Sequence, residues 1–190
     1  MSGVLIDVDW PAPANVIAGT TTRTATDQDL PPDMRFLHQV HGAAVVTSAR
    51  VRESATALDA DAVTGGEPGD YCAVRTADCL PVLLCSKDGE RIGAAHAGWR
   101  GLAAGILENT VAAMLAPAGD LLAWLGPAIS QANFEVGEEV RAAFLAHDPA
   151  ADRHFLRNPR GRWQADLYGL ARQRLRARGV EAIYGGGWCT

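Results

Sequence analysis

The chain has 190 residues, of which 48% are hydrophobic and 21% charged, and its formal net charge is −5. This composition predicts an ordinary soluble globule, and we expect residues 1–190 to form a single domain with a substantial core. The acidic balance disfavours a nucleic-acid partner, because phosphate recognition needs a basic surface.

The N-terminal residues 1–9 lack the basic start and long apolar core of a signal peptide. No apolar run in the sequence approaches the ~20 residues of a membrane helix. We therefore expect a cytoplasmic protein without a membrane partner, whose oligomeric state no sequence pattern sets.

The first two thirds of the chain read as short strands. Their continuous apolar character predicts strands that are buried on both faces, as in sheets covered by other layers. The expected strands are short apolar runs bounded by turn residues, at 4–6, 15–18, 35–38, 43–46, 71–74, 82–84 and 92–95.

Helices enter in the last third. Residues 101–116 place apolar side chains at helical spacing, and the Pro and Gly that follow should end this helix. A strand at 121–125, helices at 137–147 and 164–178, and a last strand at 181–184 complete the pattern. Because strands and helices do not alternate regularly, we predict an α+β fold with mixed sheets and outer helices.

Two further groups of residues have simple expected roles. Four arginines near the C-terminus are expected to form a solvated helix face: Arg172, Arg174, Arg176 and Arg178. The cysteines are expected to be reduced thiols, as in a cytosolic protein. Cys72 and Cys85 lie inside apolar runs and should be buried and inert.

Cys79 differs from the other cysteines because it sits at a break between apolar runs, where loops carry chemistry. It and His96 flank two apolar runs joined by the polar turn 86–90. If both runs are strands, the turn folds them into a hairpin that brings the two side chains together. A Cys and a His so placed are either a nucleophile–base pair or two metal ligands.

His41 is the third residue of this constellation. His38 lies three positions earlier and would point to the opposite face of a strand. The set His41, Cys79 and His96 leaves a fourth metal position open for water, which is typical of catalytic rather than structural zinc. Bound zinc lowers the pKa of water to roughly 7. Copper also accepts two imidazoles and a thiolate, but no Met is evidently linked to the cluster as an axial ligand.

Two neighbouring residues complete the predicted site. The glycine-rich stretch 96–101 opens into a helix, and Arg100 adds a guanidinium, so a phosphate could bind there. The alternative is a tight turn with Trp99 packed in the core, and both readings stay open. Asp78 adjoins Cys79 at a strand break, so we expect it inside the pocket, where it could move protons.

With these motifs the chain resembles the YfiH family, whose members are described as laccase-domain or polyphenol oxidase proteins and also as purine nucleoside phosphorylases. The resemblance runs from about residue 16 to residue 189. It is carried by five motifs in order: QVHG at 39–42, TADCLP at 76–81, AHAGWRG at 95–101, LGPAI at 125–129 and FEVG at 134–137.

The resemblance implies a four-layer α/β/β/α sandwich and a zinc or copper site, with His41, Cys79 and His96 on the ligand positions. It implies a purine nucleoside phosphorylase that also deaminates adenosine and cleaves methylthioadenosine, with nucleoside and phosphate as partners. Arg23 matches a family arginine and is, with Arg100, an expected anion contact. The glycine-rich segment that usually follows this arginine is absent here.

Three alternatives remain. One is a laccase-like, copper-dependent polyphenol oxidase, although multicopper oxidation needs more histidines than the five present. Another is a metal-free cysteine hydrolase that uses Cys79 and His96. The third is a metal-binding protein without enzymatic activity.

Overall fold

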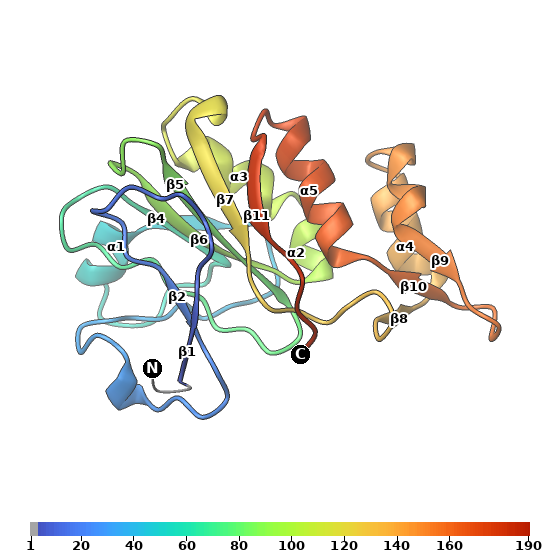
Figure 1. Cartoon of the computed structure of the whole chain (residues 1–190), viewed down its shortest axis with the longest axis horizontal. Coiled ribbons are helices and arrows are strands. Elements are labelled where there is room, and N and C mark those ends of the chain that lie inside the picture. The colour runs from blue at the N-terminus through green and yellow to red at the C-terminus, as the bar shows by residue number, and fades with distance from the viewer. Residues whose placement is uncertain (1–3) are drawn as a thin grey trace.

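The computed structural model describes residues 4–190, and its centre is a six-stranded mixed sheet (Figure 1). The strand order is β11-β7-β5-β6-β4-β3. The bounds are β3 (Val45–Thr47), β4 (Ala62–Gly65), β5 (Leu80–Ser86), β6 (Ile92–Ala97), β7 (Leu121–Leu125) and β11 (Ala182–Gly185). The two edge pairs, β3–β4 and β7–β11, are parallel, and the other neighbours are antiparallel. The expected α+β class with mixed sheets is confirmed.

Two smaller sheets flank this one. The first is the antiparallel ribbon of β1 (Leu5–Asp7) and β2 (Gly19–Thr21). The second has the order β8-β10-β9 and, in Figure 1, stands with α4 at one side of the molecule. Its members are β8 (Glu135–Val136), β9 (Phe155–Arg157), β10 (Trp163–Ala165) and the helix α4 (Glu138–Leu145).

The remaining helices are short. The α-helices are α1 (Ser48–Glu53), α2 (Trp99–Ala103), α3 (Ile106–Ala113) and α5 (Leu167–Ala177), and the 3₁₀ turns are η1 (Asp27–Asp29), η2 (Ala118–Asp120) and η3 (Pro149–His154). The helix expected at 101–116 is therefore two helices. They are separated at Gly105, whose φ of 95° is a left-handed conformation that glycine adopts without steric cost.

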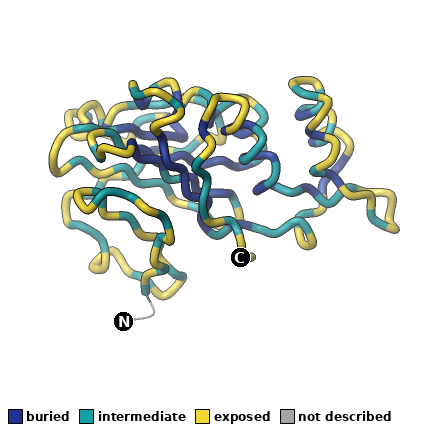
Figure 2. Tube along the Cα trace, turned by 45° about the horizontal axis from the view of Figure 1, so that its top comes forward, coloured by how far each residue is buried: buried dark blue, intermediate teal, exposed yellow. Residues whose placement is uncertain are grey.

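The main core lies between one face of the large sheet and the helices α2, α3 and α5. Leu80, Val82 and Leu84 of β5 are buried there, together with Ile106 of α3 and Leu170 of α5. Strand β7 is buried along its whole length, and β5 nearly so (Figure 2). The central strands therefore form a rigid base for the residues at their ends.

The opposite face of the sheet carries a smaller apolar cluster. Val63 and Ala94 of the sheet pack there against Leu37, Cys72 and Val74. The expected strand at 71–74 is wrong for this reason. The segment is apolar because it covers the sheet, but it is irregular and pairs with no strand.

Most other strand predictions are confirmed. The exceptions are 15–18, which is irregular, and 35–38, which contributes only an isolated bridge between His38 and Asp59. Five of the observed strands were not expected from the sequence, namely β2, β4, β8, β9 and β10. The confirmed runs are 4–6, 43–46, 82–84, 92–95, 121–125 and 181–184, which fall on β1, β3, β5, β6, β7 and β11.

The arginine cluster on α5 is only partly solvated, contrary to expectation. Arg174 is buried, with 6% of its surface exposed, and its Nη1 donates to Glu108 Oε1 at 2.6 Å. Arg172 donates to two backbone carbonyl groups of the β11 region. Only Arg176 and Arg178 are exposed. The cluster thus ties α5 to α3 and to the sheet edge.

All four cysteines are free thiols. Cys85 is buried as expected, and burial raises its pKa to about 11. Cys72 is only half-buried, and burial together with Asp70 raises the pKa of its thiol. Neither is poised to act as a nucleophile. None of the helices between residues 4 and 190 combines the length and the apolar character needed to cross a bilayer.

We expect Leu84→Ala to lower the free energy of unfolding by about 2–5 kcal/mol, because Leu84 is 1% exposed and its removal leaves a cavity. Leu156→Ala is the control, since Leu156 is 57% exposed and should change stability by less than about 0.5 kcal/mol. Denaturant titration of both variants measures the difference. Equal stabilities would mean that β5 does not anchor the core.

Candidate functional site

Three side chains from separate parts of the chain meet at one edge of the large sheet. The metal-binding atoms of His41, Cys79 and His96 all lie within 4.8 Å of one another. Cys79 directly precedes β5, His96 is near the end of β6, and the β5–β6 register pairs Pro81 with His96. The hairpin expected from the sequence is therefore confirmed, and it brings Cys79 and His96 together.

Asp61, just before β4, is the residue that organises this cluster. Its side chain is completely buried. Oδ1 lies 2.8 Å from His96 Nδ1 and accepts from the His41 backbone N–H at 2.9 Å. Oδ2 accepts from the N–H groups of Val40 at 3.2 Å and Gly42 at 2.7 Å. One carboxylate thus holds both the imidazole of His96 and the loop that carries His41.

The contact with Asp61 also decides which nitrogen of His96 is available. With the Nδ1 proton directed at Asp61, the lone pair of Nε2 remains for a ligand. Carboxylate–histidine pairs of this kind orient imidazoles in metal sites. Asp61 was not among the expected residues. The available signal was a single acidic residue inside the apolar run 60–63, because a buried charge requires partners.

Gln39 is a second unexpected positioning residue. Its Nε2 donates to the Arg75 carbonyl at 2.7 Å, and its Oε1 accepts from the Arg75 N–H at 2.7 Å. This pair joins the loop of His41 to the segment that leads to Cys79. The Gln of the QVHG motif therefore has a structural role of its own, in addition to the role proposed for the histidine.

The backbone is strained at two residues of this site. His41 has a φ of 59° and Asp78 a φ of 74°, both in the left-handed region that non-glycine residues seldom adopt. Such conformations persist only where the surroundings hold them, and they cluster at functional sites. For His41, the hydrogen bonds to Asp61 provide that hold.

Gly98 borders the cluster and keeps it open. A Cβ at this position would lie 2.8 Å from Cys79 Sγ and 3.5 Å from His96 Nε2. Ligand atoms that share one zinc ion stand about 3–4 Å apart. The donor types, their spacing and the space beside Gly98 therefore fit a single ion, which His41, Cys79 and His96 would hold.

The charges around Cys79 also favour a bound cation. Burial, and then the nearby Asp78 and Asp61 carboxylates, raise the pKa of the Cys79 thiol above its ordinary value. A thiol in such surroundings is a poor nucleophile at neutral pH, because the thiolate is the reactive form. A bound cation would favour the thiolate.

Asp78 is exposed, so our expectation that it lies inside a pocket is wrong. The left-handed turn at this residue directs its carboxylate to the C-terminal segment, where Oδ1 accepts from Thr190 Oγ1 at 2.7 Å. The carboxylate nevertheless adjoins Cys79 in sequence. An exposed carboxylate beside the cluster can still accept a proton or hydrogen bond from a substrate.

The structure bears on one of the two readings of the glycine-rich loop, and phosphate binding at Arg100 stays a prediction. Trp99 is half-buried and packs against the main core, as the structural reading predicts. Arg100 is exposed, and its guanidinium carbon lies 4.6 Å from the centre of the Trp99 ring. Arg23 follows β2 and is also exposed, and no described contact links it to the cluster.

Comparison with known proteins identifies the family. A family model described as multi-copper polyphenol oxidoreductase laccase matches residues 12–190. Purine nucleoside phosphorylase PA4543 of Pseudomonas aeruginosa is 45% identical over 213 residues, covering 96% of this chain and 86% of the relative. The chain belongs to the YfiH family. Purine nucleoside phosphorylase YfiH of Escherichia coli is 49% identical over 162 residues, covering 85% of this chain and 65% of the relative.

A solved structure supports membership of the YfiH family. The Neisseria meningitidis protein NMB0706 matches with a TM-score of 0.90 and 40% identity, covering 98% of this chain and 88% of that one. The alignment with PA4543 runs over 213 residues, more than the 190 of this chain, so that relative has residues within the matched region that this chain lacks. The chain spans about two thirds of the Escherichia coli YfiH protein.

We expect Asp61→Asn to weaken the affinity for added Zn²⁺ by about 10- to 100-fold, because an amide NH₂ would face N–H groups that now donate to a carboxylate. Competition with a chelator measures this affinity. Asp59→Asn is the matched control, since Asp59 is exposed and its carboxylate pairs with His38, outside the cluster. Equal Zn²⁺ affinities for the two variants would show that Asp61 does not support the cluster.

Proposed function

We propose that this YfiH-family chain is a zinc-dependent purine nucleoside phosphorylase whose ion is held by His41, Cys79 and His96. The observation that carries the proposal is the convergence of these three donors at one sheet edge, within 4.8 Å of one another. The relatives PA4543 and Escherichia coli YfiH are named as purine nucleoside phosphorylases. An ion with one open position is the arrangement typical of catalytic zinc.

In phosphorolysis, a phosphate oxygen bonds to the anomeric carbon of ribose while the glycosidic bond breaks and the purine leaves with the electron pair. When bound, zinc would supply a Lewis acid beside the reacting groups. Arg100 is the proposed phosphate ligand, because a guanidinium matches phosphate oxygens with paired N–H groups. Arg23 is a second proposed anion contact.

In this proposal, Asp61 positions the proposed ligands and Asp78 exchanges protons with the substrate. Asp61 fixes His96 and the loop of His41 through its four hydrogen bonds. Asp78 would accept a proton or hydrogen bond from the substrate, steadied by Thr190. Cys79 is a proposed zinc ligand. Its thiolate would also place a negative charge next to the reacting groups and so affect the electrostatic stabilisation of the transition state.

The proposal extends to two related reactions, namely phosphorolysis of methylthioadenosine and deamination of adenosine. In deamination, a water oxygen replaces the amine at purine C6 and ammonia leaves. That exchange needs a group that carries protons between water and the leaving amine, and Asp78 is the proposed carrier.

The laccase description of the family suggests a copper oxidase as an alternative. Oxidation by a multicopper centre requires several metal sites. Among residues 4–190, His41, Cys79 and His96 form the one cluster of three or more possible ligands. The single cluster favours the nucleoside reaction.

A metal-free cysteine hydrolase is the second alternative, and one contact favours it. The pairing of Asp61 with His96, beside Cys79, has the order of a Cys–His–Asp triad. Against it stands the raised pKa of the Cys79 thiol, which keeps the nucleophile protonated. Activity that survives removal of metal by a chelator would support this alternative.

We expect the purified protein to bind about one zinc per chain and Cys79→Ser to bind clearly less, because a hydroxyl is a much weaker zinc ligand than a thiolate. Elemental analysis after zinc loading measures the content. Cys72→Ser is the control, since Cys72 lies outside the cluster. If Cys79→Ser retained as much zinc as Cys72→Ser, Cys79 would not be a ligand.

We expect adenosine plus phosphate to give adenine and ribose 1-phosphate, and adenosine without phosphate to give inosine. Both activities should fall by about 10²-fold or more in His41→Ala and His96→Ala, while Arg100→Ala should slow phosphorolysis more than deamination. Chromatographic product analysis separates the reactions. His38→Ala is the control, because His38 is exposed and its side chain pairs with Asp59, outside the cluster.

Two results would contradict the nucleoside proposal. One is the absence of both products with zinc-loaded protein while copper-loaded protein oxidises phenols. The other is equal nucleoside turnover by His96→Ala and His38→Ala.

A further inference from the structure

A buried tyrosine of helix α5 connects two irregular segments of the chain. Tyr168 is 9% exposed, and its hydroxyl oxygen accepts from the Ala128 N–H at 2.8 Å. The same oxygen lies 3.0 Å from the Gly126 carbonyl oxygen and 3.1 Å from the Trp188 carbonyl oxygen, so its proton can be donated to either. Burial raises the pKa of this hydroxyl, which therefore keeps its proton at neutral pH. One hydroxyl thus links the loop after β7 to the C-terminal segment.

The loop after β7 is bonded to the chain on both sides of Cys79. The Gly126 N–H donates to the Pro81 carbonyl at 2.9 Å. The Ile129 N–H donates to the Asp78 carbonyl at 3.0 Å. The contacts of the tyrosine hydroxyl fall inside this loop, so the hydroxyl supports a clamp around the backbone of a proposed zinc ligand.

The C-terminal segment reaches the same turn. It leads from Trp188, whose carbonyl lies beside the Tyr168 hydroxyl, to Thr190. The Thr190 N–H donates to the Ala128 carbonyl at 3.3 Å. Thr190 Oγ1 donates to Asp78 Oδ1 at 2.7 Å. This segment therefore binds both the loop after β7 and the carboxylate of Asp78.

The turn on which both segments converge is strained. Asp78 has a φ of 74°, a left-handed conformation that persists in a non-glycine residue only where the surroundings hold it. Its carbonyl is held by Ile129 and its carboxylate by Thr190. Cys79 follows directly in the chain, so the direction of its side chain depends on this turn.

We propose that Tyr168 is a positioning residue for Cys79. Its hydroxyl holds the two segments that fix the turn at Asp78, and so directs the thiolate toward the ion. The role toward zinc rests on the proposed function. Asp61 performs the corresponding task for the two histidines, and its hydrogen-bond partners are not shared with the tyrosine. The three proposed ligands are thus held by two separate buried groups.

The test uses Tyr168→Phe, which removes the hydroxyl and keeps the ring. Hydrogen exchange of the metal-free full chain, measured by mass spectrometry, reports on the loop. We expect the amides of residues 126–130 to exchange about tenfold faster, since the loop loses a buried hydrogen bond. We also expect the affinity for Zn²⁺, measured by competition with a chelator, to fall by about tenfold.

Co²⁺ in place of zinc reports on Cys79 itself. A thiolate ligand gives Co²⁺ an intense charge-transfer absorption band, which imidazole ligands do not give. We expect Tyr168→Phe to lower this band relative to the d–d bands, whereas a general loss of stability would leave the spectrum of the folded, loaded protein unchanged. Thr190→Val removes only the bond to Asp78 from an exposed residue, and should lower the band less. This second variant preserves the test if Tyr168→Phe does not fold.

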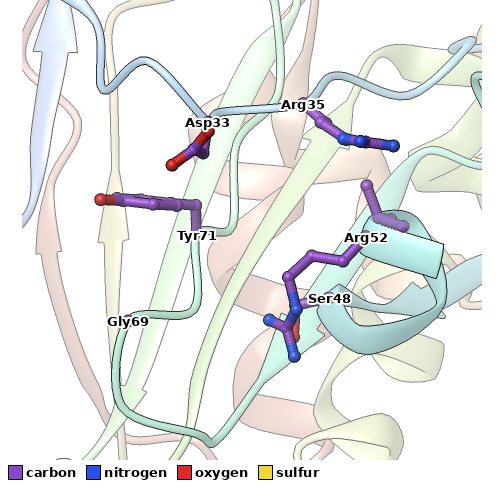
Figure 3. Close-up of a pocket in the computed structure, with 7 residues that line it drawn as sticks. Asp33, Arg35, Ser48, Arg52, Gly69 and Tyr71 are labelled. Atoms are coloured by element: carbon purple, nitrogen blue, oxygen red, sulfur yellow. The ribbon is translucent and has the colours of Figure 1, made fainter.

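Tyr71→Phe is the matched control. Tyr71 lines a cavity of about 480 Å³ beside α1, which shares no residue with the metal cluster (Figure 3). Its hydroxyl has no hydrogen-bond partner among residues 4–190, so its removal should leave exchange, Zn²⁺ affinity and the Co²⁺ spectrum unchanged.

Leu121→Ala controls for stability. Leu121 is 0% exposed and pairs with Ser86, at the end of β5 that is remote from Cys79. The cavity left by this substitution should destabilise the fold. The Zn²⁺ affinity of the folded protein should stay the same.

Two results would overturn the proposal. One is unchanged exchange of residues 126–130 in Tyr168→Phe. The other is a Zn²⁺ affinity and a Co²⁺ spectrum equal to those of Leu121→Ala. Failure of the proposed zinc site has a different signature, because Cys79→Ser would then bind as much zinc as the parent and the parent would lack the thiolate band. Faster exchange in Tyr168→Phe would still show that the hydroxyl holds the turn.

Discussion

The buried carboxylate of Asp61 joins the loop that carries His41 to the strand that carries His96. A charged group without exposure to water costs several kcal/mol unless hydrogen bonds compensate it. Here three backbone N–H groups and one imidazole do so. The same contacts hold His41 in its left-handed conformation, with a φ of 59°. The geometry of the proposed metal site therefore depends on Asp61, which is not one of the three proposed ligands.

The buried strands and the residues with proposed roles occupy different parts of the large sheet. Strands β5 and β7 are almost wholly buried, and the residues with proposed roles lie where strands begin or end. Cys79 precedes β5, and His96 stands near the end of the adjacent β6. Two proposed ligands are thus attached to one hairpin whose register is set by the core. Gly98 leaves the space beside them free of side-chain atoms.

Local sequence patterns were enough to predict the hairpin and the proximity of Cys79 and His96. The reason is that two apolar runs joined by a short polar turn usually pair as a β-hairpin. They could not reveal contacts between distant residues. Asp61 reaches His41 across 20 positions and His96 across 35, and Gln39 reaches Arg75 across 36. The exposure of Asp78 and the irregular cover at 71–74 likewise depend on tertiary packing, which apolar periodicity does not encode.

His41 differs from its two neighbours in how the fold supports it. Cys79 and His96 belong to a hairpin at the centre of the sheet, whereas His41 lies in a loop held by Asp61 and Gln39. Segments with few buried apolar contacts open more readily than core strands. Local opening of residues 38–42 would release one donor while two stay in place. An ion could then enter or leave by stepwise exchange at His41, without unfolding of the sheet.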